Sequence, residues 1–208
     1  MSNFKLVDHP ILKHKLGFLR DKNTGSAEFR SIIKEMSRLL AYEATKEMKV
    51  TSMTVETPLA TANVDRILEN PIIVSIMRAG NGMLEGLLSL LPFASAGHIG
   101  IYRDKFIKNT VEYYFKLPDD AKGRPILLAD PLLATADTAI ACVDRLKQYE
   151  VGPIKMLCIL VSPEGLERLH HFHPDVEVYG VSKEEGLTAD GYLLPGLGDA
   201  GNRLYQSN

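Results

Sequence analysis

Apolar residues follow two different periods along the chain. Short, largely apolar runs, typical of parallel strands that are covered on both faces, occupy residues 71–77, 126–129 and 154–161. Outside these runs, apolar residues recur every three or four positions, most clearly from Phe29 to Leu40, which predicts helices with one buried face. This alternation predicts an α/β fold with a mainly parallel central sheet and helices on both faces.

Weaker patterns predict several further elements. Residues 11–19 have the spacing of a short amphipathic helix, and Ser26 is expected to cap a longer one. Residues 50–57 alternate loosely and predict a strand, whereas residues 58–70 are predicted to be a polar connection. A last strand is expected at residues 176–181.

Composition and charge narrow the classes of partner. The chain has 208 residues and no repeat or linker, so residues 1–208 are predicted to form a single domain. Its formal net charge of −2, with both signs interspersed, argues against a nucleic-acid partner. We recognise no signal peptide and no run of membrane-spanning length, so no membrane partner is expected. Cys142 and Cys158 lie in apolar segments and are predicted to pack in the core, as expected for a reducing, cytoplasmic setting.

The stretch from residue 126 to residue 138 predicts an anion site. A buried strand ends at Asp130-Pro131, because proline cannot donate to a sheet ladder, and a small turn from Thr135 to Thr138 then leads into a helix. The first amides of a helix lack internal partners and favour negative charge. Asp130 is expected to face the crevice in which open α/β sheets bind ligands. The alternative is an ordinary connection between a strand and a helix.

A second loop follows the strand at residues 71–77. It reads R-A-G-N-G-M over residues 78–83, and its glycines leave room for a ligand close to the backbone. The glycine spacing is one residue off the dinucleotide pattern, and Arg78 instead favours a charged ligand with several oxygens. Farther along, strands expected at residues 98–102 and 111–116 flank a charged loop, which is either a solvated surface loop or a basic loop that excludes water and neutralises charge over a bound anion.

The C-terminal stretch, residues 187–202, is rich in glycine and contains Pro195 and Asp199. Its backbone amides and carbonyls suit a flat heterocycle such as uracil, whose edge offers a carbonyl, an N–H and a second carbonyl. An amino group in place of a carbonyl would leave buried partners unmatched. His170 and His173 have a metal-like spacing, but no third ligand is evident, and we interpret them as a polar helix end.

These stretches together resemble the uracil phosphoribosyltransferases, a family of type I phosphoribosyltransferases. The family usually has D-P-M-L-A-T-G-G-S where this chain has D-P-L-L-A-T-A-D-T, and it shares R-A-G-x-G-M, V-E-Y-Y-x-K-L-P and G-Y-x-x-P-G-L-G-D-A-G. The resemblance implies that uracil and phosphoribosyl pyrophosphate (PRPP) react to give UMP and pyrophosphate, in pyrimidine salvage. It also implies a mobile β-hairpin, a base-binding segment at residues 187–202, Mg²⁺ bound with PRPP, GTP as an allosteric activator, and a homodimer or homotetramer.

The resemblance also assigns site residues. The catalytic residues it implies are Arg78, Arg103, Asp130 and Asp199. PRPP would be bound by these four residues and by Pro131, Leu132, Leu133, Ala134, Thr135, Ala136, Asp137 and Thr138. Uracil would be bound at Leu193, Gly198, Asp199 and Ala200. No side chain is expected to bind the metal directly, since Mg²⁺ would be held mainly through PRPP and water.

Two departures from the family pattern lie in the predicted phosphate turn. Ala136 and Asp137 replace two glycines, and Ala136 would matter if that glycine has a positive φ. A carboxylate aimed at the phosphate would weaken PRPP binding, so Asp137 is expected to face solvent and activity to persist. Two other functions stay open: a nucleotide-sensing regulator that binds RNA, and a uracil-binding protein that has lost PRPP.

Overall fold

The computed structural model describes residues 3–103 and 110–207, and of Arg103 it describes the backbone alone. The helices are α1 (Pro10–Arg20), α2 (Ser26–Ala44), α3 (Asn81–Leu90), α4 (Asp137–Gln148), α5 (Pro163–Phe172) and α6 (Ala200–Tyr205). The strands are β1 (Phe4–Leu6), β2 (Val50–Glu56), β3 (Thr61–Ile67), β4 (Ile72–Met77), β5 (Ser95–Arg103), β6 (Thr110–Lys116), β7 (Ile126–Ala129), β8 (Leu132–Leu133), β9 (Ile154–Val161), β10 (Glu177–Lys183), β11 (Gly186–Leu187) and β12 (Leu193–Leu194).

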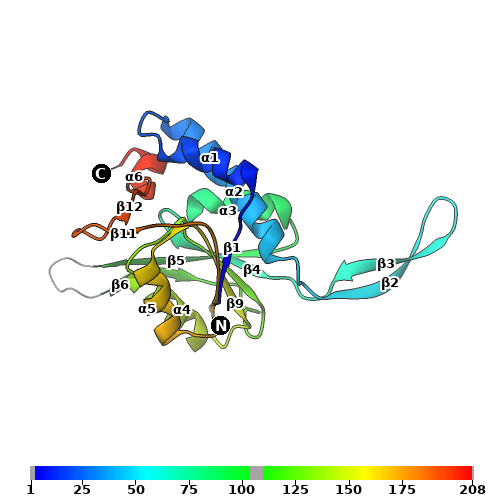
Figure 1. Cartoon of the computed structure of the whole chain (residues 1–208). Helices are drawn as coiled ribbons and strands as arrows, with labels where there is room; N and C mark the ends of the chain where they lie inside the picture. The colour runs from blue at the N-terminus through cyan, green and yellow to red at the C-terminus, as the bar shows by residue number, and fades with distance from the viewer. Residues whose placement is uncertain (1–2, 104–109, 208) are drawn as a thin grey trace.

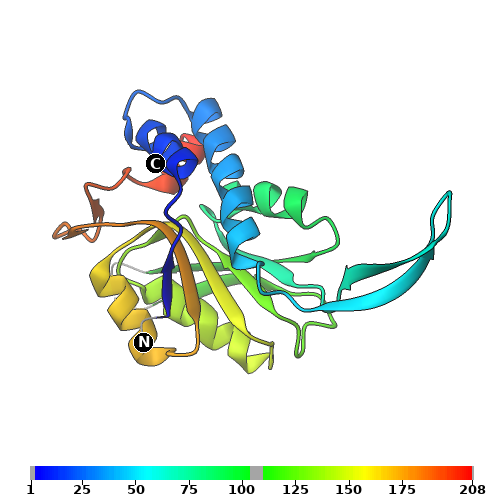
Figure 2. The same ribbon diagram turned by 45° about the vertical axis from the view of Figure 1, so that its right-hand side comes forward.

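A central sheet of eight strands organises the molecule, in the order β1-β10-β9-β7-β4-β5-β6, with β8 also paired to β9. Every pairing in this sheet is parallel except that of β5 with β6. Helices α1, α2 and α3 cover one face, and α4 and α5 cover the other (Figures 1 and 2). The predicted α/β fold, a mainly parallel sheet with helices on both faces, is therefore confirmed.

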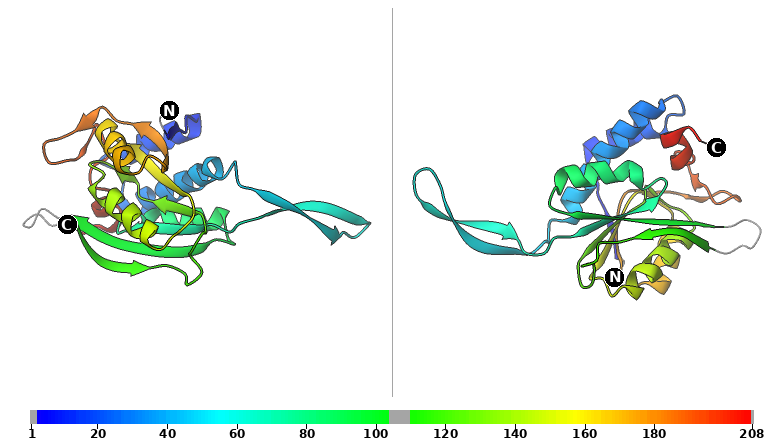
Figure 3. Two further views of the ribbon diagram at one scale, coloured as in Figure 1. Left: turned by 90° about the horizontal axis from the view of Figure 1, so that it is seen from below. Right: turned by 180° about the vertical axis from the view of Figure 1, so that it is seen from behind.

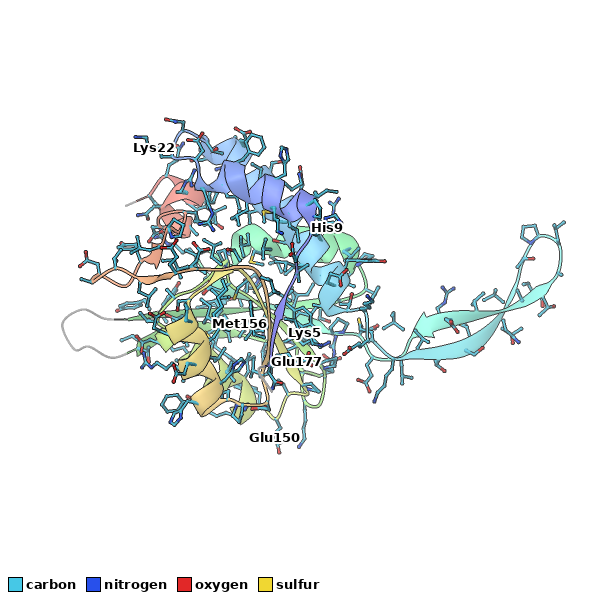
Figure 4. The ribbon with its side chains drawn as sticks, viewed as in Figure 1. Lys5, His9, Lys22, Glu150, Met156 and Glu177 are labelled. Atoms are coloured by element: carbon cyan, nitrogen blue, oxygen red, sulfur yellow. The ribbon has the colours of Figure 1, made fainter. Side chains whose placement is uncertain are left out.

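The apolar runs of the sequence form the strands that are covered on both faces of the sheet. Strands β4, β7 and β9 are almost entirely buried, because one hydrophobic cluster packs on each face of the sheet. Cys142 and Cys158 are buried free thiols, and burial raises the pKa of both well above the ordinary value, so their predicted packing role is confirmed. At the sheet edge, Lys5 of β1 pairs with Glu177 of β10 at 2.9 Å (Figure 4).

The prediction for residues 58–70 was wrong. Residues 61–67 form strand β3, which pairs antiparallel with β2 over its whole length. This β2–β3 hairpin, which we call the arm, extends away from the sheet and its helices (Figures 1 and 3). Most arm residues are exposed, and polar residues outnumber apolar ones in β3, so its weak alternation did not predict a strand.

Smaller differences concern the ends of elements. Helix α2 begins at Ser26 itself, with Gly25 in the capping position. A second hairpin joins β5 to β6, as expected, but its connection at residues 104–109 lies outside the described residues, so its mobility stays a prediction. Within the described ranges, no helix has both the length and the apolar character needed to cross a membrane.

Candidate active site

Three loops meet at the carboxyl ends of the parallel strands. A Cβ atom added to Gly80, after β4, would lie 2.3 Å from a carbonyl oxygen at the end of β7. A Cβ atom on Gly201, in α6, would lie 3.3 Å from Oδ1 of Asp199 and 3.8 Å from Nη2 of Arg78. Asp130, which follows β7, experiences the charge of Asp199. The structure thus brings together Arg78, Asp130 and Asp199, three of the four residues predicted to be catalytic.

The two predicted arginines differ in how much of them is described. Arg78 follows β4, its Nη1 donates to Oγ of Ser207 at 2.6 Å, and its carbonyl accepts from the hydroxyl of Tyr205 at 3.2 Å. The C-terminal segment therefore packs against Arg78. Arg103 is the last residue of β5, next to β4 in the sheet, and its backbone pairs with Thr110. Its side chain lies outside the described residues, so its contact with a diphosphate stays a prediction.

Asp130 has the most perturbed acid group of the site. Burial raises its pKa, and the charge of Asp199 raises it further, against a weak hydrogen bond from the amide of Leu132 at 3.5 Å. The resulting pKa is about 7, compared with 3.8 for an ordinary aspartate. A desolvated carboxyl group of this kind gains from hydroxyl donors that replace its missing water.

The first half of the sugar-phosphate loop, which we define as residues 130–138, extends the sheet. The carbonyl of Pro131 accepts the amides of Ile159 and Leu160, at 2.9 and 3.0 Å. Leu132 and Leu133 form β8 on β9, and the side chain of Leu133 is buried in the core. These residues therefore offer a ligand their backbone more than their side chains.

The second half of the loop is a turn held by α5. The hydroxyl of Ser162 donates to the carbonyl of Ala134 at 2.6 Å, and Nη1 of Arg168 donates to the carbonyl of Thr135 at 3.1 Å. Ala136 then has φ = 65° and ψ = 0°, a left-handed conformation that is costly for alanine. The departure at Ala136 therefore does fall on a position that favours glycine, and Thr138 follows in the first turn of α4.

The expectation that Asp137 faces solvent was wrong. Its side chain is only 12% exposed, since Oδ1 pairs with Nη2 of Arg168 at 2.6 Å and Oδ2 accepts the hydroxyl of Thr135 at 3.1 Å. The sequence pattern shows no partner for this carboxylate because Arg168 lies 31 positions farther along the chain, on a different helix. Ion pairing across the fold explains why the side chain turns inward.

The base loop, residues 186–199, lies between β10 and α6 (Figure 1). Strands β11 and β12 pair to form a small ribbon. Gly196 and Gly198 have φ = 63° and 80°, which places their amides in orientations that other residues reach only with strain. Leu193 and Ala200 are buried, and the carboxylate of Asp199 caps α6 by accepting the amide of Asn202 at 2.8 Å. The predicted uracil residues thus lie on one continuous segment beside Arg78.

A buried ion pair anchors the base loop from behind. Both oxygens of Glu184 bind the guanidinium of Arg20, at 2.6 and 2.7 Å, and Oε2 also accepts the amide of Gly196 at 2.8 Å. Burial alone would raise the pKa of Glu184, but the hydrogen bonds from Arg20, Gly196 and Ser182 outweigh it and lower the pKa. Arg20 further donates to the carbonyl of Gly196, so α1 holds the loop shape directly.

Sequence reasoning missed these anchoring residues. Arg20, Arg168 and Glu184 lie outside every motif, and each acts through a partner that is distant in sequence. A pattern of local spacing holds no signal for such pairs. His170 and His173, by contrast, do lie at the end of α5, where His170 contacts the carbonyl of Val176 at 3.1 Å. Among the described residues, no group of three or more His, Cys, Asp or Glu has the geometry of a metal site.

The fold is that of the phosphoribosyltransferases. An adenine phosphoribosyl transferase from Trypanosoma brucei superposes with a TM-score of 0.59, over 92% of this chain and 87% of that chain. At 13% identity this likeness concerns the fold alone.

The chain belongs to the uracil phosphoribosyltransferase family, whose model matches residues 6–207. A uracil phosphoribosyltransferase from Brucella abortus is 49% identical over 202 residues, which are 96% of this chain and 97% of that protein. A solved protein from Aquifex aeolicus superposes with a TM-score of 0.93 at 32% identity, over 97% of both chains. The resemblance noted in the motifs is thereby confirmed.

Proposed function

We propose that this protein transfers the ribosyl phosphate of PRPP to uracil, forming UMP and pyrophosphate. The observation that carries the proposal is the convergence of Arg78, Asp130 and Asp199 beside the glycine-rich base loop. The same reaction type is named for the Brucella relative. The site joins a phosphate turn, two carboxylates and a glycine-rich backbone segment, which are the parts that this transfer needs.

Each part of the site has a role in this proposal. The turn at residues 134–138 binds the 5′-phosphate at the first amides of α4. Asp130 accepts the ribose hydroxyls, and Arg78, together with Arg103, stabilises the diphosphate as it leaves. The backbone at Leu193, Gly198 and Ala200 pairs with the edge of uracil. The base is thereby held against the anomeric carbon while negative charge develops on the other side.

Mg²⁺ is part of the same proposal. The two neighbouring carboxylates of Asp130 and Asp199 suit a hard cation that is held mainly by diphosphate oxygens and water. When bound with PRPP, the ion would supply positive charge to the leaving group. We also expect GTP to activate the enzyme, and the rate of UMP formation measured with and without GTP tests this.

Direct assay of the purified protein tests the function. Radiolabelled uracil, PRPP and Mg²⁺ should give labelled UMP, and cytosine should give no product. Arg78→Gln should lower the turnover by at least about a hundredfold. Calorimetric titration separates the alternatives: uracil binding without PRPP binding indicates a uracil-binding protein, and retention of RNA together with UMP indicates a regulator.

We also propose that the protein is a cytoplasmic homodimer or homotetramer. The arm supports the oligomer, because it extends from the body and leaves Val50, Met53 and Leu59 exposed by 52%, 45% and 97%. The two buried free thiols support a reducing compartment. Sedimentation should give at least twice the mass of one chain, and replacement of the arm tip by a short turn should reduce that mass.

A further inference from the structure

We propose that Arg168 is a positioning residue for PRPP: it neutralises the carboxylate of Asp137 and fixes the turn that receives the 5′-phosphate. The inference rests on the proposed function and deepens it. Nothing in the family motifs points to Arg168, because the glycines usual at positions 136 and 137 carry no charge to neutralise.

The contacts of Arg168 place it at the turn. Its guanidinium reaches from α5 to two neighbouring residues, with Nη2 at 2.6 Å from Oδ1 of Asp137 and Nη1 at 3.1 Å from the carbonyl oxygen of Thr135. Thr135 also donates its hydroxyl to the other carboxylate oxygen. The carboxylate is thereby fixed on the α5 side of the turn and is removed from solvent, with 12% of its side chain exposed.

The backbone of the turn faces α5 with its carbonyls. The carbonyl of Ala134 accepts from the hydroxyl of Ser162, and the carbonyl of Thr135 accepts from the guanidinium of Arg168. In a trans peptide the N–H points opposite to the carbonyl, so the amides of Thr135 and Ala136 point away from α5. Gly165 permits this close approach, because a Cβ atom there would lie 2.2 Å from the carbonyl oxygen of Ala134. Helix α5 thus orients two amides as phosphate donors.

Charge explains why an arginine is needed. An unpaired carboxylate beside the first turn of α4 would repel a phosphate across a few ångströms, and burial strengthens the repulsion. With Arg168 in place, the pair adds no net charge, and the helix terminus and its amides still favour the anion. The departure at Asp137 is therefore compatible with PRPP binding only while the arginine is present.

Steady-state kinetics of four proteins test this inference. Arg168→Gln should raise the KM for PRPP by about tenfold to a hundredfold, with the KM for uracil and kcat within about twofold of the wild type. Asp137→Asn removes the negative charge and leaves the positive charge of Arg168, so it should lower the KM for PRPP. The double variant should return the KM to within about threefold of the wild-type value, since no charge is then left unpaired.

Two further variants serve as controls. Arg145→Gln breaks a comparable ion pair, with Glu112 at 3.0 Å, at the other end of α4, and should leave the KM for PRPP unchanged. Arg168→Lys keeps the positive charge and should stay within about threefold of the wild type. It also provides the test, together with Asp137→Asn, if Arg168→Gln does not fold.

The possible outcomes separate the two proposals. A wild-type KM in Arg168→Gln overturns the inference. A raised KM that Asp137→Asn fails to lower also overturns it, because neutralisation of the Asp137 carboxylate, on which the proposal depends, would then have no effect. If Arg168→Lys raises the KM for PRPP as much as Arg168→Gln does, the positive charge is not what supports PRPP binding, and the inference is again overturned. A wild-type protein that forms no UMP overturns the proposed function instead.

Discussion

The base loop and the sugar-phosphate loop are each held by an arginine and a carboxylate, but the carboxylate has a different place in each. Glu184 lies behind the base loop, with a side chain that is 1% exposed, and acts on it through the amide of Gly196. Asp137 belongs to the sugar-phosphate loop itself. A pair behind a loop stabilises its shape whatever the ligand, whereas a pair inside a loop meets the charge of the ligand directly.

The two loops also differ at their left-handed positions. The base loop uses glycine at position 196, where a Cβ atom would lie 2.1 Å from the carbonyl oxygen of Leu193. The sugar-phosphate loop has Ala136 at φ = 65°, which α5 and the neighbouring ion pair hold in place. The first loop is relaxed by its sequence, and the second is constrained by its surroundings. Four substitutions test this contrast.

Removal of the buried acid should have the largest effect. Glu184→Ala leaves Arg20 without its partner and the amide of Gly196 without its acceptor, so the free energy of unfolding should fall by about 4 kcal/mol. Denaturant titration measures the change. Glu47→Ala, which removes an exposed ion pair with Lys5 at 3.6 Å, is the control and should change stability by less than about 1 kcal/mol. Equal losses in the two variants would contradict the role given to Glu184.

The second-largest loss of stability is expected when a methyl group is added at Gly196. Gly196→Ala combines a left-handed φ with a backbone clash, and we expect a loss of about 3 kcal/mol in unfolding free energy. The KM for uracil should rise while the KM for PRPP stays the same, because the distortion is confined to the base loop. Gly17→Ala is the control, since a Cβ atom there meets nothing within 4 Å. An unchanged KM for uracil would show that the loop adapts.

Asp130, the first residue of the sugar-phosphate loop, should make the stability of the protein depend on pH. With a pKa of about 7 in the folded state and an ordinary value in the unfolded state, Asp130 stabilises the protein at low pH and loses that contribution as pH rises through 7. Asp130→Asn removes this dependence. The stability of the variant relative to the wild type should therefore increase by about 2.5 kcal/mol from pH 5 to pH 7.5. A constant difference across that range would show that the carboxyl group titrates normally.

The smallest effect on stability is expected from an alanine-to-glycine substitution at position 136. Ala136→Gly relieves the left-handed strain and should raise the free energy of unfolding by about 1 kcal/mol, although glycine also gains freedom in the unfolded chain. Thermal unfolding without ligand measures the change. Ala141→Gly, in the interior of α4, should instead lower stability by about 1 kcal/mol. A loss in both variants would mean that the turn tolerates alanine without strain.

The same contrast explains how far the sequence predicted the structure. Buried strands such as β4, β7 and β9 were predictable because cover on both faces leaves an apolar run. The arm strand β3 was not, because a strand exposed on its faces carries no such run. In the site, local motifs predicted where Arg78, Asp130 and Asp199 lie. The direction of Asp137 was missed, because it depends on Arg168, a residue that only the folded chain brings near.

Strand β8 has one more consequence for how the sugar-phosphate loop can be observed. The amides of Ile159, Leu160 and Ser162 donate to the carbonyls of Pro131 and Leu133, so three protons on β9 and at its end are locked by the loop rather than by a neighbouring long strand. Their exchange with deuterated solvent reports any opening of the loop, residue by residue. Hydrogen exchange at these amides therefore measures opening of the phosphate site without a bound ligand.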